Sequence, residues 1–209
     1  MKLIRGIIVM VVFVIAGGFL TVVSIRDKIE FANRKDISTM GAKDFHAGQF
    51  VTGEIYEVWD QFMHETETNT DTNTTKTTRY YFAVPLETTF EDDEPIFIAI
   101  AVKNSTDLAT AKRMSKETDD WYLNDIEPDV WTTMKADGKV TKMDDEDYSY
   151  FMKYLKQQGY TAQNAAPYII NIGGNASAAT PLLIIGIVLL VVGLLVITII
   201  VLSFLRHRM

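Results

Sequence analysis

The chain has 209 residues, a formal net charge of −7 and no cysteine. The length suits about one to one and a half ordinary domains, and the lack of cysteine excludes a disulfide framework, thiol catalysis and thiolate metal sites. All 27 acidic residues but only 16 of the 20 basic ones lie in residues 26–180, which gives this segment a formal charge of −11. An acidic domain repels nucleic acid, so we expect no nucleic-acid partner.

Both ends of the chain carry a long apolar run without a charge. Residues 6–25 form the first run and residues 182–205 the second. A helix of about 20 apolar residues is long enough to cross a hydrocarbon core about 30 Å thick. The two runs therefore predict two transmembrane helices in a lipid bilayer, with short cytoplasmic tails at residues 1–5 and 206–209.

The first run has a second interpretation, as a cleaved signal peptide, because Lys2 and Arg5 provide a positive start. The apolar part of a signal peptide is only about 7–15 residues long and ends at a small-x-small cleavage site. This run is longer and has no such site. We therefore expect an uncleaved signal anchor and a chain that passes the membrane more than once.

Basic residues predict the orientation of the two spans. Arg206 and Arg208 follow the second run, whereas residues 157–181 before it contain no lysine or arginine. The basic excess marks the cytoplasmic side, so we expect both termini in the cytoplasm of a cell membrane. Residues 26–180 are then extracytoplasmic, and their last part, the small and uncharged residues 173–181, is typical of a flexible linker.

Three segments of the exposed region read as strands. Residues 50–63, 79–86 and 96–103 are rich in β-branched and aromatic types and are bounded by turn-forming residues, which is typical of strands. The third is apolar on both faces, so we expect it to be buried on both. An acidic turn at residues 91–95 separates it from the second. The three segments predict an antiparallel β-meander.

A threonine-rich tract, ETETNTDTNTTKTTRYY, lies between the first two of these segments. Threonine favours strands, and the tract has neither glycine nor proline. We expect a long hairpin with its polar loop at residues 64–78 and its turn near Asn69–Asn73. The tract is then a solvated tip, a partner-contacting arm or an ice-binding face; the lack of proline disfavours a mucin-like stalk.

The remaining elements make the expected fold α+β. Residues 105–120 carry a thin apolar stripe behind a capping residue and predict a helix. Within residues 130–143, Asp137-Gly138 is a strong hairpin signal. Residues 144–159 predict a second helix that Asp144 caps, and a last strand follows at 167–172.

This order of elements carries a resemblance across the whole chain. Val51, Gly53 and Ile55, the threonine-rich loop and the RYYFAVPL segment occur in sequence, and the chain resembles uncharacterised bacterial two-span membrane proteins with an exported β-rich domain. The first three strands also resemble the opening meander of an OB-like sheet. That family has no assigned activity, so the resemblance implies topology and no catalytic residue.

The sequence offers little for catalysis or metal binding. His46 and His64 lack the spacing of a zinc site. The acidic clusters at Glu91–Glu94 and Asp144–Asp147 do not follow the calcium-loop pattern, and a turn and a helix start explain them. With no serine elbow and no phosphate-binding loop, we expect no cofactor, no metal and no enzymatic activity.

Two sets of residues are candidates for recognition. Small residues in the spans can let helices approach closely, although glycine is also simply common in membrane helices. The helix-packing candidates are Gly17, Gly18, Thr21, Gly186 and Gly193. The partner-contact candidates lie on the hairpin and at its base: Trp59, Thr66, Thr68, Thr70, Thr72, Thr74, Tyr80 and Tyr81.

Three functions fit these features. In the leading hypothesis the acidic extracytoplasmic domain binds another membrane or envelope protein, or an envelope component, through the hairpin. In the second, the chain is an accessory subunit of a transport or secretion complex that recognises the glycine-bearing spans. In the third, two carboxylates of the outer domain form an exported hydrolase. The sequence alone does not identify the partner.

Overall fold

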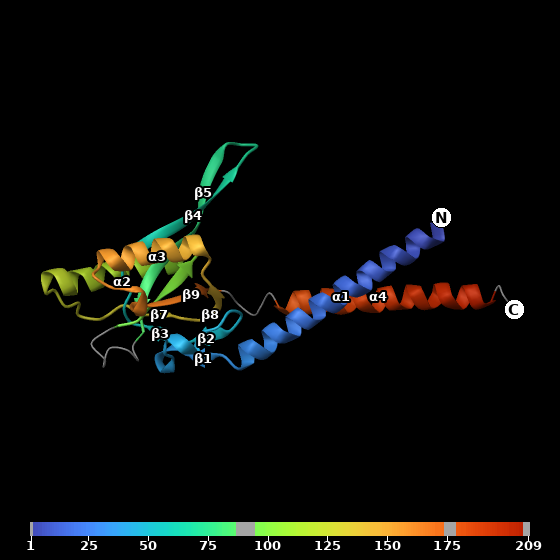
Figure 1. Cartoon of the computed structure of the whole chain (residues 1–209), viewed down its shortest axis with the longest axis horizontal. Coiled ribbons are helices and arrows are strands. Elements are labelled where there is room, and N and C mark those ends of the chain that lie inside the picture. The colour runs from blue at the N-terminus through green and yellow to red at the C-terminus, as the bar shows by residue number, and fades with distance from the viewer. Residues whose placement is uncertain (1, 87–94, 174–178, 207–209) are drawn as a thin grey trace. The chain divides into compact units, whose positions relative to one another are not determined.

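The computed structural model describes residues 2–86, 95–173 and 179–206 (Figure 1). It divides into two compact units. One unit contains the terminal helices α1 (Lys2–Ala32) and α4 (Ala179–Arg206), and the other is the domain Asn33–Asn175. The acidic turn expected at 91–95 and the linker expected at 173–181 fall largely outside the described residues.

Both terminal helices are long and apolar enough to cross a membrane. The qualifying stretches are Ile8–Ala32 and Thr180–Ser203, and only 11% of each most apolar window is buried within the chain. The core helix of a soluble protein would bury most of such a surface. The apolar side chains of α1 and α4 therefore face outward along most of their length.

The domain combines a mixed sheet with two helices. Its strands and helices, in chain order, are β1 (Lys35–Asp36), β2 (Phe50–Thr52), β3 (Glu54–Ile55), β4 (Gln61–Asn69), β5 (Thr74–Pro85), β6 (Phe97–Val102), α2 (Ser105–Asn124), β7 (Met134–Lys135), β8 (Gly138–Lys142), α3 (Asp145–Gln157) and β9 (Ala165–Ile172). The described residues form one seven-stranded sheet in the order β1-β2-β8-β9-β6-β5-β4, and a small sheet of β3 and β7. Pairs β1–β2 and β6–β9 are parallel, and the other pairs are antiparallel.

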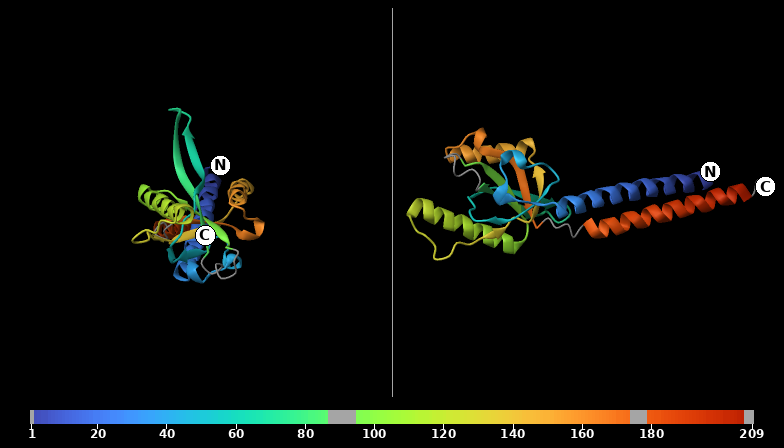
Figure 2. Two further views of the ribbon diagram at one scale, coloured as in Figure 1. Left: turned by 90° about the vertical axis from the view of Figure 1, so that its left-hand side faces the viewer. Right: turned by 90° about the horizontal axis from the view of Figure 1, so that it is seen from below.

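Strand β6 is the centre of the domain, and all six of its residues are buried. Ile98, Ile100 and Val102 face a core that includes Ala111 and Met114 of α2. Phe97, Ala99 and Ala101 face a second core with residues of α3. Figure 2 shows α2 and α3 on either side of the sheet. The expected burial of this strand on both faces is therefore confirmed.

The two domain helices are confirmed where the sequence predicts them, with small changes at their ends. The side chain of Asn104 caps α2 by accepting from the backbone N–H of Asp107 at 2.8 Å. Asp144 caps α3 in the same way through the N–H of Asp147, at 2.8 Å. Such caps satisfy backbone donors that the first helical turn leaves unpaired.

The threonine-rich tract forms a β-hairpin. Strand β4 pairs with β5 from Gln61 opposite Phe82 as far as Asn69 opposite Thr74. The side chain of Asn69 accepts from the N–H of Asp71 at 2.9 Å, and Asn73 has a left-handed φ of 51°. Asparagine tolerates that conformation. The turn between Asn69 and Thr74 lies where the sequence predicts it, near Asn69–Asn73.

The expected three-strand meander is wrong in two respects. Residues 50–63 are not one strand, because β2, β3 and β4 lie in different parts of the fold, and the break comes at Gly53 with a φ of 121°. The antiparallel run is β4–β5–β6, and β6 continues to β9 in parallel. The fold class is therefore α+β with a mixed sheet, and the OB-like meander stays a prediction without support in this topology.

The hairpin predicted at Asp137-Gly138 is also wrong. Strand β7 pairs with β3 in the small sheet, whereas β8 pairs with β2 and β9 in the large one. Glycine occupies position 138 because the neighbouring strand passes very close: a Cβ there would lie 2.6 Å from the carbonyl oxygen of Asn171. This glycine therefore permits the close approach of another backbone and does not form a tight turn.

This packing predicts that Gly138→Ala destabilises the domain by about 1–3 kcal/mol, the usual range for overpacking. Gly41→Ala is the matched control, since a Cβ there meets only the Asp44 carboxylate at 3.7 Å. Chemical denaturation of the full chain in detergent measures both free energies of unfolding. Equal stability of the two variants would contradict the β8–β9 pairing.

Candidate functional site

The terminal helices pack against each other in antiparallel order. A Cβ on Gly17 would approach Gly186 and Leu190, while a Cβ on Gly193 would approach Val14 and Met10. A contact residue nearer the C-terminus of α4 therefore meets a residue nearer the N-terminus of α1, which makes the two helices antiparallel. Both connections to the domain consequently leave from the same end of this helix pair.

The glycines of this contact leave no room for a side chain. A Cβ on Gly17 would lie 2.7 Å from the backbone nitrogen of Leu190, and one on Gly186 would lie 2.7 Å from Oγ1 of Thr21. The Thr21 hydroxyl donates to the carbonyl of Gly17 at 2.7 Å, so it stays hydrogen-bonded within α1. Small residues of this kind let backbones pack closely in membranes.

One of the five packing candidates does not take part in this contact. A Cβ on Gly18 would meet only a Leu190 methyl carbon at 3.9 Å, which is ordinary van der Waals distance. The structure therefore brings Gly17, Thr21, Gly186 and Gly193 together within the chain and leaves Gly18 beside them.

The hairpin beyond Glu65 forms what we call the arm, residues 66–77, whose two faces differ chemically. Opposed pairs Thr66–Thr77 and Thr68–Thr75 make one face entirely of threonine, and the Thr68 and Thr75 hydroxyls are 3.0 Å apart. On the other face, Glu67 lies opposite Lys76. All the arm residues except the half-buried Thr77 are exposed.

The three aromatic residues expected at the base of the hairpin do not form one surface. Tyr81 is only 4% exposed and belongs to the α3-side core, whereas Tyr80 packs against the α2-side core under Lys112. Trp59 precedes β4, and its ring packs on Phe97 with centroids 4.8 Å apart. Successive side chains of a strand point to opposite faces of the sheet, so Tyr80 and Tyr81 do not share one contact surface.

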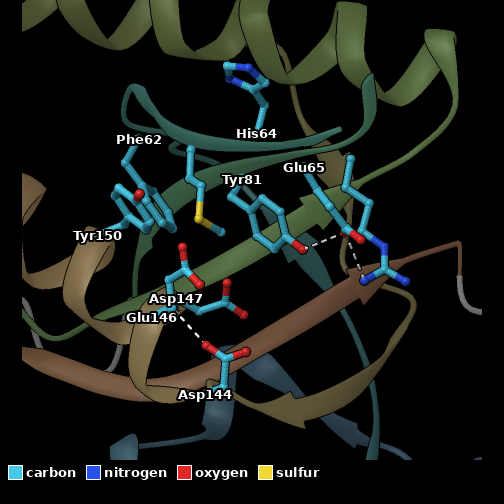
Figure 3. A pocket seen from close by; sticks show the side chains of 10 residues that line it. Phe62, His64, Glu65, Tyr81, Asp144, Glu146, Asp147 and Tyr150 are labelled. Carbon is cyan, nitrogen blue, oxygen red and sulfur yellow. Dashed lines mark hydrogen bonds and ion pairs between the residues drawn. The ribbon is translucent and has the colours of Figure 1, made fainter. Parts of the chain in front are cut away.

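A hollow of about 600 Å³ lies where the charged face of the hairpin reaches the start of α3 (Figure 3). Its charged lining consists of four carboxylates, Glu65, Asp144, Glu146 and Asp147, and the guanidinium of Arg79. Phe62, Tyr81 and Tyr150 supply aromatic walls, and His64 points away from the carboxylates.

Hydrogen bonds organise one wall of this hollow. The hydroxyl of Tyr81 donates to Glu65 at 3.2 Å, and Arg79 forms an ion pair with the same carboxylate at 3.3 Å. The Glu65–Arg79 pair depends on a register shift between Glu65 and Thr66, because the register of the arm alone would place Glu65 opposite Thr78. A shift of this kind has no signal in the sequence. The approach of α3 to this pair depends on tertiary packing, and no local signal indicated it.

The hollow is electrostatically biased toward a positive ligand. Burial, and then the nearby carboxylates of Asp144, Glu65 and Glu146, raise the pKa of Asp147, and Arg79 opposes this shift. Burial likewise raises the pKa of the Tyr81 hydroxyl. A single guanidinium does not balance four carboxylates, so a cationic group at this position would relieve their repulsion.

The hollow does not have the geometry of a metal centre. Within residues 2–86, 95–173 and 179–206, no group of three or more histidine and carboxylate side chains is close enough to hold a metal ion. Glu91–Glu94, the other acidic cluster considered for calcium, lies outside these ranges. The charged lining of the hollow favours ion pairs with a basic group.

The comparison with protein families assigns a family but gives no activity. Residues 1–203 match the family described as Domain of unknown function (DUF8577). The chain belongs to this family. No curated protein and no solved structure matches the chain. The family indicates no enzyme, and the bacterial origin stays a prediction.

The helix contact predicts that Gly17→Leu weakens the packing of α1 on α4 by about 1–3 kcal/mol, because the new side chain must displace backbone atoms. Gly18→Leu adds the same side chain one residue away and should change the stability little. Unfolding of the full chain by a denaturing detergent compares the two. A smaller effect at Gly17 than at Gly18 would contradict the contact.

Proposed function

We propose that the chain is a non-enzymatic, membrane-anchored protein whose acidic domain binds a basic surface of another membrane or envelope protein. The binding surface is the arm together with the hollow at its foot. The observation that carries this proposal is the excess of carboxylates in that hollow, directly beside a projecting pair of strands.

The shape of the hairpin supports a role in contact. Strand β5 begins in the arm and ends in the core, where Tyr81–Pro85 are buried. In Figure 1 the arm extends away from α2 and α3. A surface that is exposed on both faces adds nothing to the domain core, so its twelve residues are available for a partner.

The charge of the domain favours a basic partner. Residues 26–180 carry a formal charge of −11, which attracts a basic protein and speeds the encounter. Ion pairs at the rim of an interface contribute about 0.2–1 kcal/mol each. Binding through this surface should therefore weaken as the salt concentration rises.

The proposed location follows from the two apolar helices. With both spanning a cell membrane as a signal anchor and a second span, Arg206 at the end of α4 and Arg208 after it favour cytoplasmic termini. Residues 26–180 are then extracytoplasmic. The close helix contact at Gly17 and Gly186 supports retention of α1 as an anchor instead of its cleavage.

An accessory subunit of a transport or secretion complex is the second candidate. The outward apolar faces of α1 and α4 favour it, since they leave a large surface for other helices. The glycines themselves already meet within the chain. Recognition by a larger complex would therefore use other faces of the two helices.

The arm hypothesis predicts that replacing residues 66–77 by Asn-Gly abolishes capture of a specific partner and leaves the domain folded. The replacement keeps both Glu65 and Arg79 and removes only residues beyond them. In-cell crosslinking followed by mass spectrometry compares the partners of the intact and shortened chains. An unchanged set of partners would contradict the hypothesis and direct attention to the helices.

Two further variants separate the faces of the arm. Exchanging the charges in Glu67→Lys/Lys76→Glu keeps the composition and should preserve the fold. Replacing Thr66, Thr68, Thr75 and Thr77 by serine keeps the hydroxyls but removes four methyl groups. Loss of capture with the charge exchange alone would agree with ionic recognition, whereas loss with the serine variant alone would contradict it.

A further inference from the structure

A second cleft, apart from the arm and its hollow, has no role in the proposed function. It lies where the C-terminal halves of α2 and α3 meet the segment before β4, and its volume is about 320 Å³. Ligand pockets in proteins usually span about 300–1,000 Å³, so this cleft suits a small molecule. Its walls combine aromatic rings with carboxylates, and the lining residues that the structure describes include no lysine or arginine.

Three aromatic side chains form one side of the cleft around Trp59. The ring of Trp59 lies 6.1 Å from that of Tyr122 and 5.7 Å from that of Tyr160, at interplanar angles of 55° and 59°. The indole nitrogen of Trp59 donates to Glu57, which fixes the ring. Tilted rings around one space are the arrangement that binds organic cations by their π faces.

Two carboxylates supply negative charge on the other side. Asp60 accepts from Ser115 Oγ at 3.1 Å. The side-chain carboxylate of Asp119 has no hydrogen-bond or ion-pair partner among the described residues. Burial, followed by the charges of Asp60 and Asp120, raises the pKa of Asp119. The two acids therefore repel each other, and no lysine or arginine among the described lining residues offsets this repulsion.

A buried hydroxyl in the same wall also lacks a partner. Thr118 is 4% exposed, lines the cleft, and its Oγ1 has no hydrogen-bond partner among the described residues. Buried polar groups are normally hydrogen-bonded, so an exception next to a cavity requires an explanation. This oxygen has less than 1 Å² of exposed surface, so a polar group of a ligand in the cleft would reach it only after a small shift of the wall.

We propose that this cleft binds a small alkylammonium group, held between the rings of Trp59, Tyr122 and Tyr160 and the carboxylates of Asp60 and Asp119. A metal ion fits less well, because two carboxylates among aromatic rings provide too few ligands. A neutral apolar molecule would leave both carboxylates uncompensated. The group can belong to a free compound such as choline or to a lipid headgroup that carries the same cation.

The test uses the full chain in a maltoside detergent, which has no cationic headgroup. Isothermal titration calorimetry measures binding of choline and of its uncharged isostere 3,3-dimethylbutan-1-ol. We expect saturable choline binding that is at least about tenfold tighter than that of the isostere, since the isostere lacks the cation–π and ionic attraction. A dispersed short-chain phosphocholine lipid, compared with its phosphoglycerol analogue, shows whether a lipid headgroup is the better source.

Substitutions assign the binding to the cleft. Asp119→Asn should weaken choline binding about tenfold by removing one partly buried charge, while Asp129→Asn, an exposed acid outside the lining, should leave it unchanged. Tyr122→Leu should weaken binding about three- to tenfold; Tyr122 is 57% exposed, so this variant should fold even if Asp119→Asn does not.

Three results would overturn the proposal. The first is the absence of saturable binding for both choline and the phosphocholine lipid. The second is equal binding of choline and its isostere, and the third is equal weakening by the Asp119 and Asp129 substitutions. Because the cleft shares no residue with the arm or the hollow, the shortened-arm protein should bind choline normally. Failure of one proposal is therefore distinguishable from failure of the other.

Discussion

The close antiparallel contact of α1 and α4 is the constraint on which the organisation of this chain depends. Glycine at positions 17, 186 and 193 lets the two backbones approach to distances that exclude even a methyl group. In a bilayer, helices gain little from apolar burial against each other, so close packing of small residues has to supply the stability. The contact keeps the C-terminal end of α1 and the N-terminal end of α4 at the same end of the helix pair.

Within the domain, strand β6 is the element on which the packing of the other elements depends. It separates two cores, one under α2 and one under α3, and both of its faces are fully buried. Its neighbour β5 continues beyond the core into the arm, which is thus an extension of the central sheet. The same arrangement directs α3 so that its acidic first turn reaches the foot of the hairpin, where Glu65 and Arg79 pair.

Local patterns were sufficient to predict some elements and misleading for others. The helix at Asp144, the hairpin of the threonine tract and the double burial of β6 follow from capping, strand propensity and apolar periodicity. The signal at Asp137-Gly138 was misleading because glycine also permits close backbone approach, which only the partner strand reveals. The hollow and the aromatic cleft each join segments far apart in sequence, so neither Asp147 beside Glu65 nor Asp119 beside Trp59 had a local signature.

The proposed topology, with residues 26–180 and both chain termini on opposite sides of a membrane, is the claim to test first. The chain has no cysteine, so a single cysteine introduced at Thr70 in the tip of the arm, at Lys2, or at Arg208 is the only thiol of each variant. Labelling intact cells with a membrane-impermeant maleimide, with permeabilised cells as the reference, tests all three positions. The account predicts that the Thr70 variant is labelled in intact cells and the two terminal variants only after permeabilisation. Protection of the Thr70 variant, or labelling of either terminus in intact cells, would contradict it.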